Sequence, residues 1–409
     1  MGAVPPQADK TDIEVNVLIS SEALLGLPFF EVTELSETVD AVRISARFIG
    51  PVSCPVCDSS HLRVSDRGVR RLRHESLGLR RCELLLETRK WLCKCCGRRF
   101  WQRFPGILPR RRATEAFRKS VSIRHWDGVS RSRLGQRERI GSATVERWFH
   151  DYLKLKAKER SPLCPRVLGI DEHFFTRRQG YATTFCDLKG HKVFDVVLGR
   201  SEASLESYLG QLKGKDQVQV VCMDLSSTYR ALARKHFPQA RIVADRFHVI
   251  RLVNHHFLAC WKQIDPQGAK SRGLLSLMRR HSRNLKDEAQ RQRLQAYFKQ
   301  FPALAPIYDF KQELCELLLE KHCTHQTCRR LVKRLLQSID DLLNSKLEPL
   351  VSLGQTLHSW QEEIATMFRF TKNNGITEGF HNKMETLTRQ AYGFRSFANY
   401  RLRVRVMCS

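Results

Sequence analysis

The sequence predicts a multidomain α/β protein, and three observations lead to that prediction. The chain has 409 residues, which is more than one ordinary domain holds. Two C-x-x-C pairs lie within residues 51–108 and indicate a small metal-binding module. Strand and helix signals alternate over residues 166–248, and almost purely helical sequence follows up to about residue 370. We therefore expect an α/β domain, a long helical region and smaller modules that precede them.

The charge of the chain is large, positive and unevenly distributed. The net charge is +28, yet residues 1–50 hold three basic and eight acidic residues, so the rest of the chain carries about +33. A field of this size favours a polyanionic partner, of which nucleic acid is the commonest. An anionic membrane surface or a ribosome-like scaffold is the alternative partner. No apolar run reaches the ~18 residues of a membrane span, and the N-terminus lacks a signal pattern, so we expect a cytoplasmic protein.

The first 50 residues are expected to form a segment of their own. Residues 12–27 predict a short helix, and the alternation of apolar and polar residues over 29–50 predicts strands. The boundary falls at residue 50 because a block rich in cysteine and arginine starts directly after it.

The cysteine block predicts a structural zinc site. Cys54 and Cys57 form one C-x-x-C pair, Cys93 and Cys96 form the other, and two such pairs complete a tetrahedral shell of four thiolates. A closed shell leaves no open position, which is typical of a structural ion in a zinc ribbon. Cys95 competes with Cys96 as the fourth ligand. The alternatives are buried cysteines without metal and a redox pair, but no thioredoxin-like βαβ pattern surrounds them.

Arginines in this block are candidates for phosphate contacts. The residues that we select are Arg70, Arg71, Arg73, Arg98 and Arg99. Some arginines of such a block are expected only to form a solvated face.

Residues 109–160 predict a helix-turn-helix domain that binds DNA. The stretch 113–156 divides into three helices at two glycine-containing breaks, and Ser142 is expected to cap the third. Thr144 and Arg147 on that helix would then face a DNA groove, while Val145, Trp148 and Phe149 point inward. The alternative is a small helical bundle that only joins two domains.

Acidic residues follow the strand-like runs of the α/β region. Asp171 follows Val167–Ile170, and Asp224 follows the run that ends at Met223. Carboxylates at neighbouring strand ends repel each other unless a divalent cation lies between them, and such oxygen ligands suit Mg²⁺ or Mn²⁺. A two-metal site activates water or a 3′-hydroxyl and stabilises the leaving oxygen in phosphodiester chemistry. This would explain acidic residues within a basic protein.

A third carboxylate is needed, and Glu378 in the polar turn "NNGITEGFHNK" is the candidate. Glu172 could replace Asp171, and Asp245 or Asp187 could replace Asp224. Each acid by itself could equally be a surface group or a helix cap.

The stretch "ADRFHV" places Asp245 and His248 three residues apart after a predicted strand. These two side chains could brace the site or contact the scissile phosphate. The plainer alternative is that Asp245 caps the N-terminus of a helix.

These motifs together resemble the ISL-three family of bacterial insertion-sequence transposases. The resemblance is carried, in this order, by "CPVC…CKCCGRRF", "GIDEHF", "CMDLSSTY", "ADRFHV" and "NNGITEGFHNK". It implies a ribonuclease-H-like DDE domain in two parts, residues 161–248 and 371–409, separated by an all-helical insertion over 249–370. Two departures from the family pattern are the compact second cysteine pair and Met384-Glu385, where relatives more often have an aliphatic residue and a lysine.

The resemblance also implies a chemistry and partners. Asp171, Asp224 and Glu378 would form a catalytic triad that holds two Mg²⁺ ions, and the zinc would be structural. The protein would bind the terminal inverted repeats of a mobile element as a homodimer or higher multimer, cleave the DNA and transfer the strand to a target within the bacterial nucleoid. The alternatives are a catalytically inactive, transposase-derived DNA-binding regulator and a junction resolvase.

Overall fold

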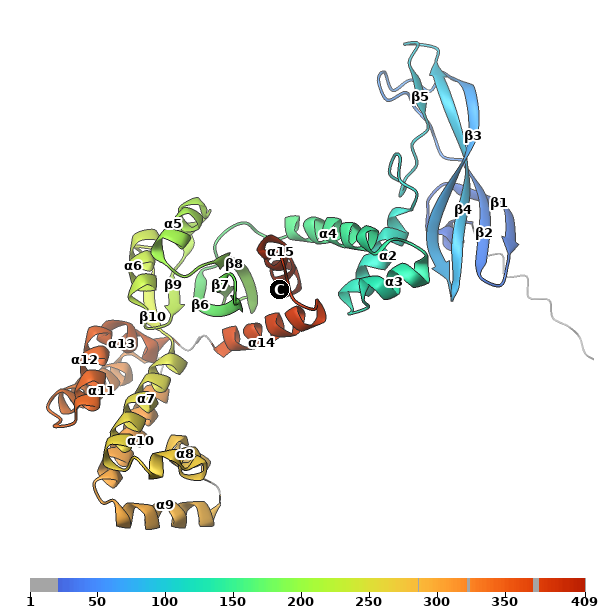
Figure 1. The fold of residues 1–409 in the computed structure, drawn as a ribbon. Helices are drawn as coiled ribbons and strands as arrows, with labels where there is room; N and C mark the ends of the chain where they lie inside the picture. The colour runs from blue at the N-terminus through green and yellow to red at the C-terminus, as the bar shows by residue number, and fades with distance from the viewer. Residues whose placement is uncertain (1–20, 286, 322–323, 371–374, 409) are drawn as a thin grey trace, which may run out of the picture. The chain divides into compact units, whose positions relative to one another are not determined.

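The computed structural model describes residues 21–285, 287–321, 324–370 and 375–408. The chain divides into two compact units, Met1–Leu155 and Lys156–Ser409, and each is described by itself (Figure 1). Within the described ranges, no helix is both long and apolar enough to cross a membrane.

The first unit is built on a five-stranded sheet in the order β1-β2-β4-β3, with β5 paired to β4. The elements are α1 (Ser21–Leu25), β1 (Phe30–Glu37), β2 (Ala41–Phe48), β3 (Leu62–Leu77), β4 (Arg80–Cys93) and β5 (Arg99–Trp101). The strands expected in residues 29–50 are thus confirmed as β1 and β2, while most of the helix expected over residues 12–27 lies outside the described residues.

Strand β2 pairs in parallel with β4, so the boundary expected at residue 50 falls between strands of one sheet. The physical reason is the apolar face that the two strands share. Val42, Ile44 and Ala46 lie opposite Cys82, Leu84 and Leu86 in the register, and all six are buried in one core. Neither stretch could bury this face alone.

Three helices follow the sheet, as expected from the sequence. They are α2 (Glu115–Trp126), α3 (Arg131–Glu138) and α4 (Ser142–Lys158). Val145 and Phe149 are buried, and Trp148 packs at the edge of the helical core. The N–H groups of Thr144 and Val145 donate to the Gly141 carbonyl, so Ser142 is the first residue of α4 rather than its cap.

A buried carboxylate joins the sheet to the helices. The Glu138 side chain is only 1% exposed, and its oxygens lie 2.6 Å from Arg124 Nη1 and 3.2 Å from Arg73 Nη2. Ser76 on β3 also donates a hydrogen bond to it. The Arg73 guanidinium lies 5.1 Å from the centre of the Phe117 ring. A buried charge is tolerated only with such partners, so the contacts fix α2 and α3 against β3.

We expect Glu138→Ala to lower the free energy of local unfolding of α2 and α3 by about 3 kcal/mol, because it leaves two half-buried arginines without a counter-charge. Hydrogen exchange of the full chain measures this loss in peptides from α2 and α3. The matched control is Glu31→Ala, which removes an exposed partner of Arg47 and should cost less than about 1 kcal/mol. Equal exchange in the two variants would contradict this role of Glu138.

The second unit contains a mixed sheet in the order β10-β9-β6-β7-β8. The strands are β6 (Val167–Thr176), β7 (Gly180–Asp187), β8 (Lys192–Leu198), β9 (Val220–Met223) and β10 (Arg241–Ala244). Strands β6, β7 and β8 form an antiparallel meander, and β6, β9 and β10 run in parallel. The expected hairpin turn is confirmed, since the Asp187 carboxylate accepts hydrogen bonds from the N–H groups of Lys189 and Gly190.

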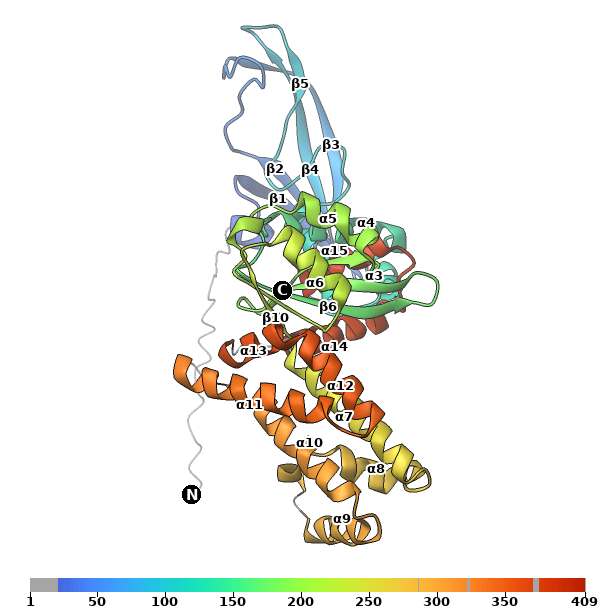
Figure 2. The same ribbon diagram turned by 90° about the vertical axis from the view of Figure 1, so that its left-hand side faces the viewer.

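Helices cover both faces of this sheet. Between β8 and β10 lie α5 (Glu202–Gln211), η1 (Lys215–Gln217) and α6 (Ser227–His236). The C-terminal helices are α14 (Gly375–Gln390) and α15 (Phe397–Met407). Helices α5 and α6 lie on one side and α14 and α15 on the other (Figures 1 and 2). The four residues of β9 are all buried, as expected for a parallel strand covered on both faces.

The long helical region is also confirmed, and it begins at Arg246. Its elements are α7 (Arg246–Ile264), η2 (Gly268–Lys270), α8 (Arg272–Arg279), η3 (Ser282–Asn284), α9 (Glu288–Gln300), α10 (Leu304–Leu319), α11 (His325–Leu343), α12 (Glu348–Ser359) and α13 (Gln361–Arg369). Helix α13 packs on β10, the edge strand of the sheet (Figure 2). The Arg246 side chain is buried here and donates to the carbonyls of Glu320 and Met367, which ties the region to the sheet.

Candidate functional sites

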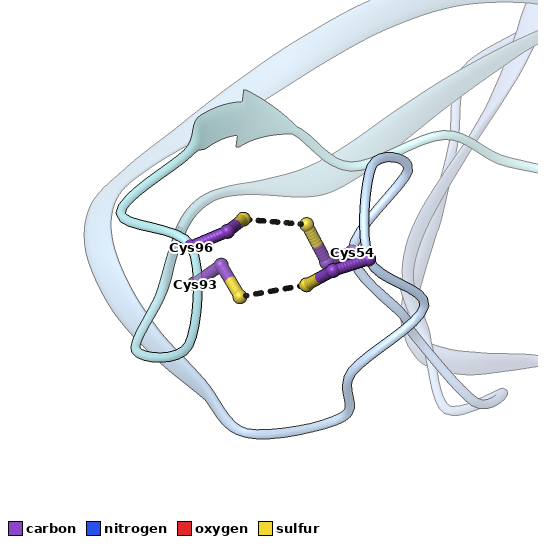
Figure 3. Close-up of side chains that lie close together, drawn as sticks. Cys54, Cys93 and Cys96 are labelled. Atoms are coloured by element: carbon purple, nitrogen blue, oxygen red, sulfur yellow. Dashed lines mark hydrogen bonds between the residues drawn. The ribbon is translucent and has the colours of Figure 1, made fainter.

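The four predicted zinc ligands meet at one end of the long β3–β4 hairpin (Figure 3). Cys54 and Cys57 lie in the loop before β3, Cys93 ends β4, and Cys96 lies in the turn before β5. The Sγ atoms of Cys54 and Cys96 are 3.5 Å apart, those of Cys57 and Cys93 are 3.6 Å apart, and all four lie within 4.8 Å of one another. Gly97, with φ of +70°, allows the tight turn behind the second pair.

This donor set fits a tetrahedral zinc ion, for which four thiolates are a common shell. Backbone N–H groups of Cys96 and Cys95 lower the pKa of Cys93 to about 6, and this favours the thiolate that binds metal. Cys95 lies outside the cluster. Its Sγ atom instead contacts Ser59 Oγ at 3.1 Å. The geometry therefore favours Cys96 over Cys95 as the fourth ligand.

We expect Cys96→Ser to lose most of the one zinc ion per chain that the cluster would hold, whereas Cys95→Ser keeps it. The reason is that only Cys96 brings its sulfur to the other three cysteines. Zinc content measured by elemental mass spectrometry on the purified full chain checks this. Equal zinc in both variants would contradict the assignment.

The arginines selected for DNA contacts have different surroundings. Arg71 forms an ion pair with both oxygens of Glu83, and Arg73 is held by Glu138. Arg70 donates to the carbonyls of Leu108 and Arg111.

Arg98 and Arg99 are exposed beside the cysteine cluster. On α4, Arg147 is exposed and its Nη2 lies 3.1 Å from Thr144 Oγ1. Contact of these side chains with DNA stays a prediction, and the internal ion pairs of Arg71 and Arg73 compete with it.

The acids of the α/β domain lie on or directly after three neighbouring parallel strands. Asp224 follows β9 and Asp245 follows β10. Asp171 was expected to end its strand, but β6 continues to Thr176 because it remains paired with β7. Only the pairing of β6 with β9 stops, at Ile170 and Met223. Asp171 is thus the first residue beyond that pairing, and the three acids lie at one edge of the sheet.

His248, in the first turn of α7, lies between two of these acids. Its Nδ1 is 2.8 Å from Asp245 Oδ2 and 2.8 Å from Asp224 Oδ1, and the contact with Asp245 has hydrogen-bond geometry. Asp245 also accepts a hydrogen bond from the N–H of Phe247 through its other oxygen. The cap expected at Asp245 is therefore confirmed, whereas a role of Asp245 and His248 in bracing a catalytic site or contacting a phosphate stays a prediction. Ligand atoms of Asp171, Asp224 and His248 lie within 4.8 Å of one another.

The electrostatics of this cluster favour a bound cation. Burial and the nearby Asp224 carboxylate raise the pKa of Asp171 to about 7. Burial by itself would lower the pKa of His248, but its contacts with Asp224 and Asp245 outweigh burial and raise that pKa to about 10. Asp224 Oδ1 is buried, and its 2.8 Å ion-pair contact with His248 Nδ1 lacks hydrogen-bond geometry. Crowded carboxylates fit Mg²⁺ or Mn²⁺, which prefer oxygen ligands.

The structure describes the third predicted acid only in part. Glu378 belongs to the first turn of α14, but its side chain lies outside the described residues. Of the alternatives, Glu172 forms an ion pair with Arg200 at 3.0 Å, and Asp187 caps the β7–β8 hairpin turn. Neither belongs to the cluster of Asp171, Asp224 and His248.

Two histidines of the site were missed by the sequence analysis. His381 Nδ1 lies 3.9 Å from Asp171 Oδ2, and its ring centre is 5.3 Å from that of His173. His173 in turn contacts Thr184 Oγ1 at 2.9 Å and the Tyr400 hydroxyl at 2.8 Å. Burial lowers the pKa of His381 to about 4. His381 could have been found in the sequence from its spacing, because it follows Glu378 by three residues in a predicted helix.

An open cleft of about 1160 Å³ lies beside Asp224 and His248. One wall is the turn from Leu225 to Tyr229, and the other is α7 from Phe247 to Leu258. Arg251 and Arg279 add positive charge to it, while the charge of Arg200 is offset by its ion pair with Glu172, which also lines the cleft. The cleft is therefore open to solvent, large and partly basic, as a site for a polyanion requires.

Comparison with known proteins adds the family to this geometry. A family model described as "Transposase", of the ISL3 group, matches residues 168–404, which is more than half of the chain. The chain belongs to the ISL3 family of transposases. A second model, described as the zinc-finger of transposase IS204/IS1001/IS1096/IS1165, matches residues 50–96. The chain is also 24% identical over 402 residues to the "Transposase for insertion sequence element IS1001" of Bordetella parapertussis, with 94% of this chain and 96% of that protein covered.

Family membership confirms the resemblance drawn from the sequence motifs. The match over residues 168–404 includes the sheet, the helical region and the acids at the sheet edge. The zinc-finger match and the Cys54–Cys96 cluster together indicate structural zinc, and the ISL3 domain indicates a divalent metal. The family supports a transposing enzyme whose partner is DNA.

Proposed function

We propose that this ISL3 transposase binds the terminal inverted repeats of its element, cleaves the DNA there in a Mg²⁺-dependent reaction and joins the freed 3′-hydroxyl to target DNA. The observation that carries the proposal is the convergence of Asp171, Asp224 and His248 within 4.8 Å, beside a cleft of about 1160 Å³. Family membership supports the same reaction class.

In this proposal Asp171 and Asp224 hold the divalent ions, with Mn²⁺ as a substitute. When bound, two such ions activate the attacking oxygen and stabilise the leaving oxygen of a phosphodiester. Asp245 positions the neighbouring His248, and the charge on His248 faces the edge where a scissile phosphate would lie. The arginines of the cleft would hold the DNA on either side of that phosphate.

Glu378 is the proposed third carboxylate of the triad. Two facts about α14 support this proposal. The described part of the helix brings His381 to within 3.9 Å of Asp171, and Glu378 lies three residues earlier in the same helix. Residues three apart share a helix face, so α14 is suited to deliver an acid to the Asp171 edge.

We expect Asp224→Asn and Glu378→Gln each to reduce DNA cleavage at least about a thousandfold, because each removes a charged metal ligand. The assay uses the full chain, Mg²⁺ and labelled duplex that carries the element's terminal repeat. Binding of the repeat without divalent metal should remain within about twofold of wild type. The matched controls are Asp309→Asn, an exposed acid on α10, and Glu385→Gln, an exposed acid on α14, and both should cleave normally.

Cleavage that survives in Asp224→Asn would overturn the proposed site. Specific binding of the repeat by the wild-type chain, with no cleavage under Mg²⁺ or Mn²⁺, would instead favour the DNA-binding regulator. Cutting of branched DNA without joining of ends would favour a junction resolvase.

A further inference from the structure

We infer that Arg110, Arg111 and Arg112 form a clamp for the phosphate backbone of the DNA that α4 binds. These residues lie in the loop between β5 and α2 (Figure 1). We call Pro109–Arg112 the arginine loop. The inference rests on the DNA binding by α4 that the sequence predicts, and it extends that binding to a second contact surface.

The arginine loop and α4 border one cavity. A cavity of about 490 Å³ is lined by all three arginines and, from the N-terminal part of α4 and the residue before it, by Gly141, Thr144 and Arg147. A neighbouring cavity of about 300 Å³ is lined by Arg111 and Arg147 again. Thr144 and Arg147 are the two residues proposed to face a DNA groove, so the loop stands directly beside that groove-facing surface.

The charge of this surface is not balanced within the protein. Arg110, Arg111 and Arg112 are exposed, and none of them forms an ion pair with a carboxylate among the described residues. The 490 Å³ cavity is lined by no acidic residue. The neighbouring cavity contains Asp151, which is already paired with Arg118 at 2.9 Å. Several unpaired cations in one place repel one another, and a polyanion relieves that repulsion.

The loop is held in place by backbone and side-chain contacts. The N–H of Arg73 on β3 donates to the Arg112 carbonyl at 2.9 Å, and the Thr114 N–H donates to the Arg73 carbonyl at 3.0 Å. Arg70 donates to the carbonyls of Leu108 and Arg111. The three guanidinium groups are thus presented from a fixed backbone, which reduces the entropy lost when they contact phosphates. This also gives Arg70 a structural role that differs from the predicted phosphate contact.

The partner that fits is the phosphate backbone rather than base edges. Bidentate guanidinium groups match phosphate oxygens. Contacts of this kind position a protein on the duplex but carry no sequence information. Thr144 and Arg147 would read bases. The arginine loop would fix the position of α4 along the DNA by holding phosphates of the flanking DNA strand.

The test is a salt series of DNA binding with the full chain in the absence of Mg²⁺. Two labelled duplexes are used, one with the element's terminal repeat and one of random sequence. The variant carries Arg110→Gln, Arg111→Gln and Arg112→Gln. Its slope of log affinity against log salt should fall by about 2 to 3, because each lost phosphate contact is worth about 0.9. Affinity at about 100 mM salt should fall at least about tenfold, by the same factor on both duplexes.

Two controls separate phosphate contact from misfolding and from net charge. The variant with Arg110→Lys, Arg111→Lys and Arg112→Lys keeps the charge and should keep most of the slope. The variant with Arg330→Gln, Lys333→Gln and Arg334→Gln loses the same charge from exposed positions on α11 and should leave the slope unchanged.

The outcomes are distinguishable. An unchanged slope in the glutamine variant of the loop, or an equal fall in the α11 variant, would overturn the inference. A loss confined to one of the two duplexes would also overturn it, because phosphate contacts carry no sequence information. If the wild-type chain binds both duplexes equally, the proposed recognition of the repeat fails, but the slope still decides whether the arginine loop contacts phosphates.

Discussion

The repulsion between carboxylates at one sheet edge is the constraint on which the second unit depends. Strands β6, β9 and β10 run in parallel, so Asp171, Asp224 and Asp245 arrive at the same edge, and burial raises the pKa of Asp171 to about 7. His248 offsets part of this repulsion through Asp224 and Asp245. A divalent cation would offset the rest. The cleft, the helical region that starts at Arg246 and the return of α14 to β6 are all arranged around this edge.

The first unit has the opposite electrostatic constraint, because its excess charge is positive rather than negative. Some arginines are neutralised within the protein, as Arg73 and Arg124 are by the buried Glu138. These internal pairs stabilise the contact between sheet and helices. Others, such as those of the arginine loop, stay exposed and unpaired among the described residues. The structure therefore separates arginines that are neutralised within the protein from exposed ones that have no carboxylate partner among the described residues. A count of charges along the sequence cannot do this.

Local patterns in the sequence predicted the elements well, and contacts between distant residues explain what they missed. C-x-x-C spacing identified Cys54, Cys57 and Cys93, but the choice of Cys96 over Cys95 needed the positions of the sulfurs. Asp171 and Asp224 followed apolar runs, yet the end of β6 was misplaced because its pairing with β7 is invisible in a single run. His173 and His381 lie more than two hundred residues apart, and their meeting arises only from the path of α14.

The central claim is that Asp171, Asp224 and Glu378 share one divalent-metal centre. The most direct test replaces Mg²⁺ with Fe²⁺ in the full chain and maps the backbone cuts that ascorbate and peroxide then generate next to the bound iron. We expect cuts near residues 171, 224 and 378, which excess Mg²⁺ suppresses and which are lost in Asp224→Asn. Cuts near 171 and 224 but none near 378 would remove Glu378 from the centre. Cuts at all three that Mg²⁺ does not suppress would contradict a shared Mg²⁺ site.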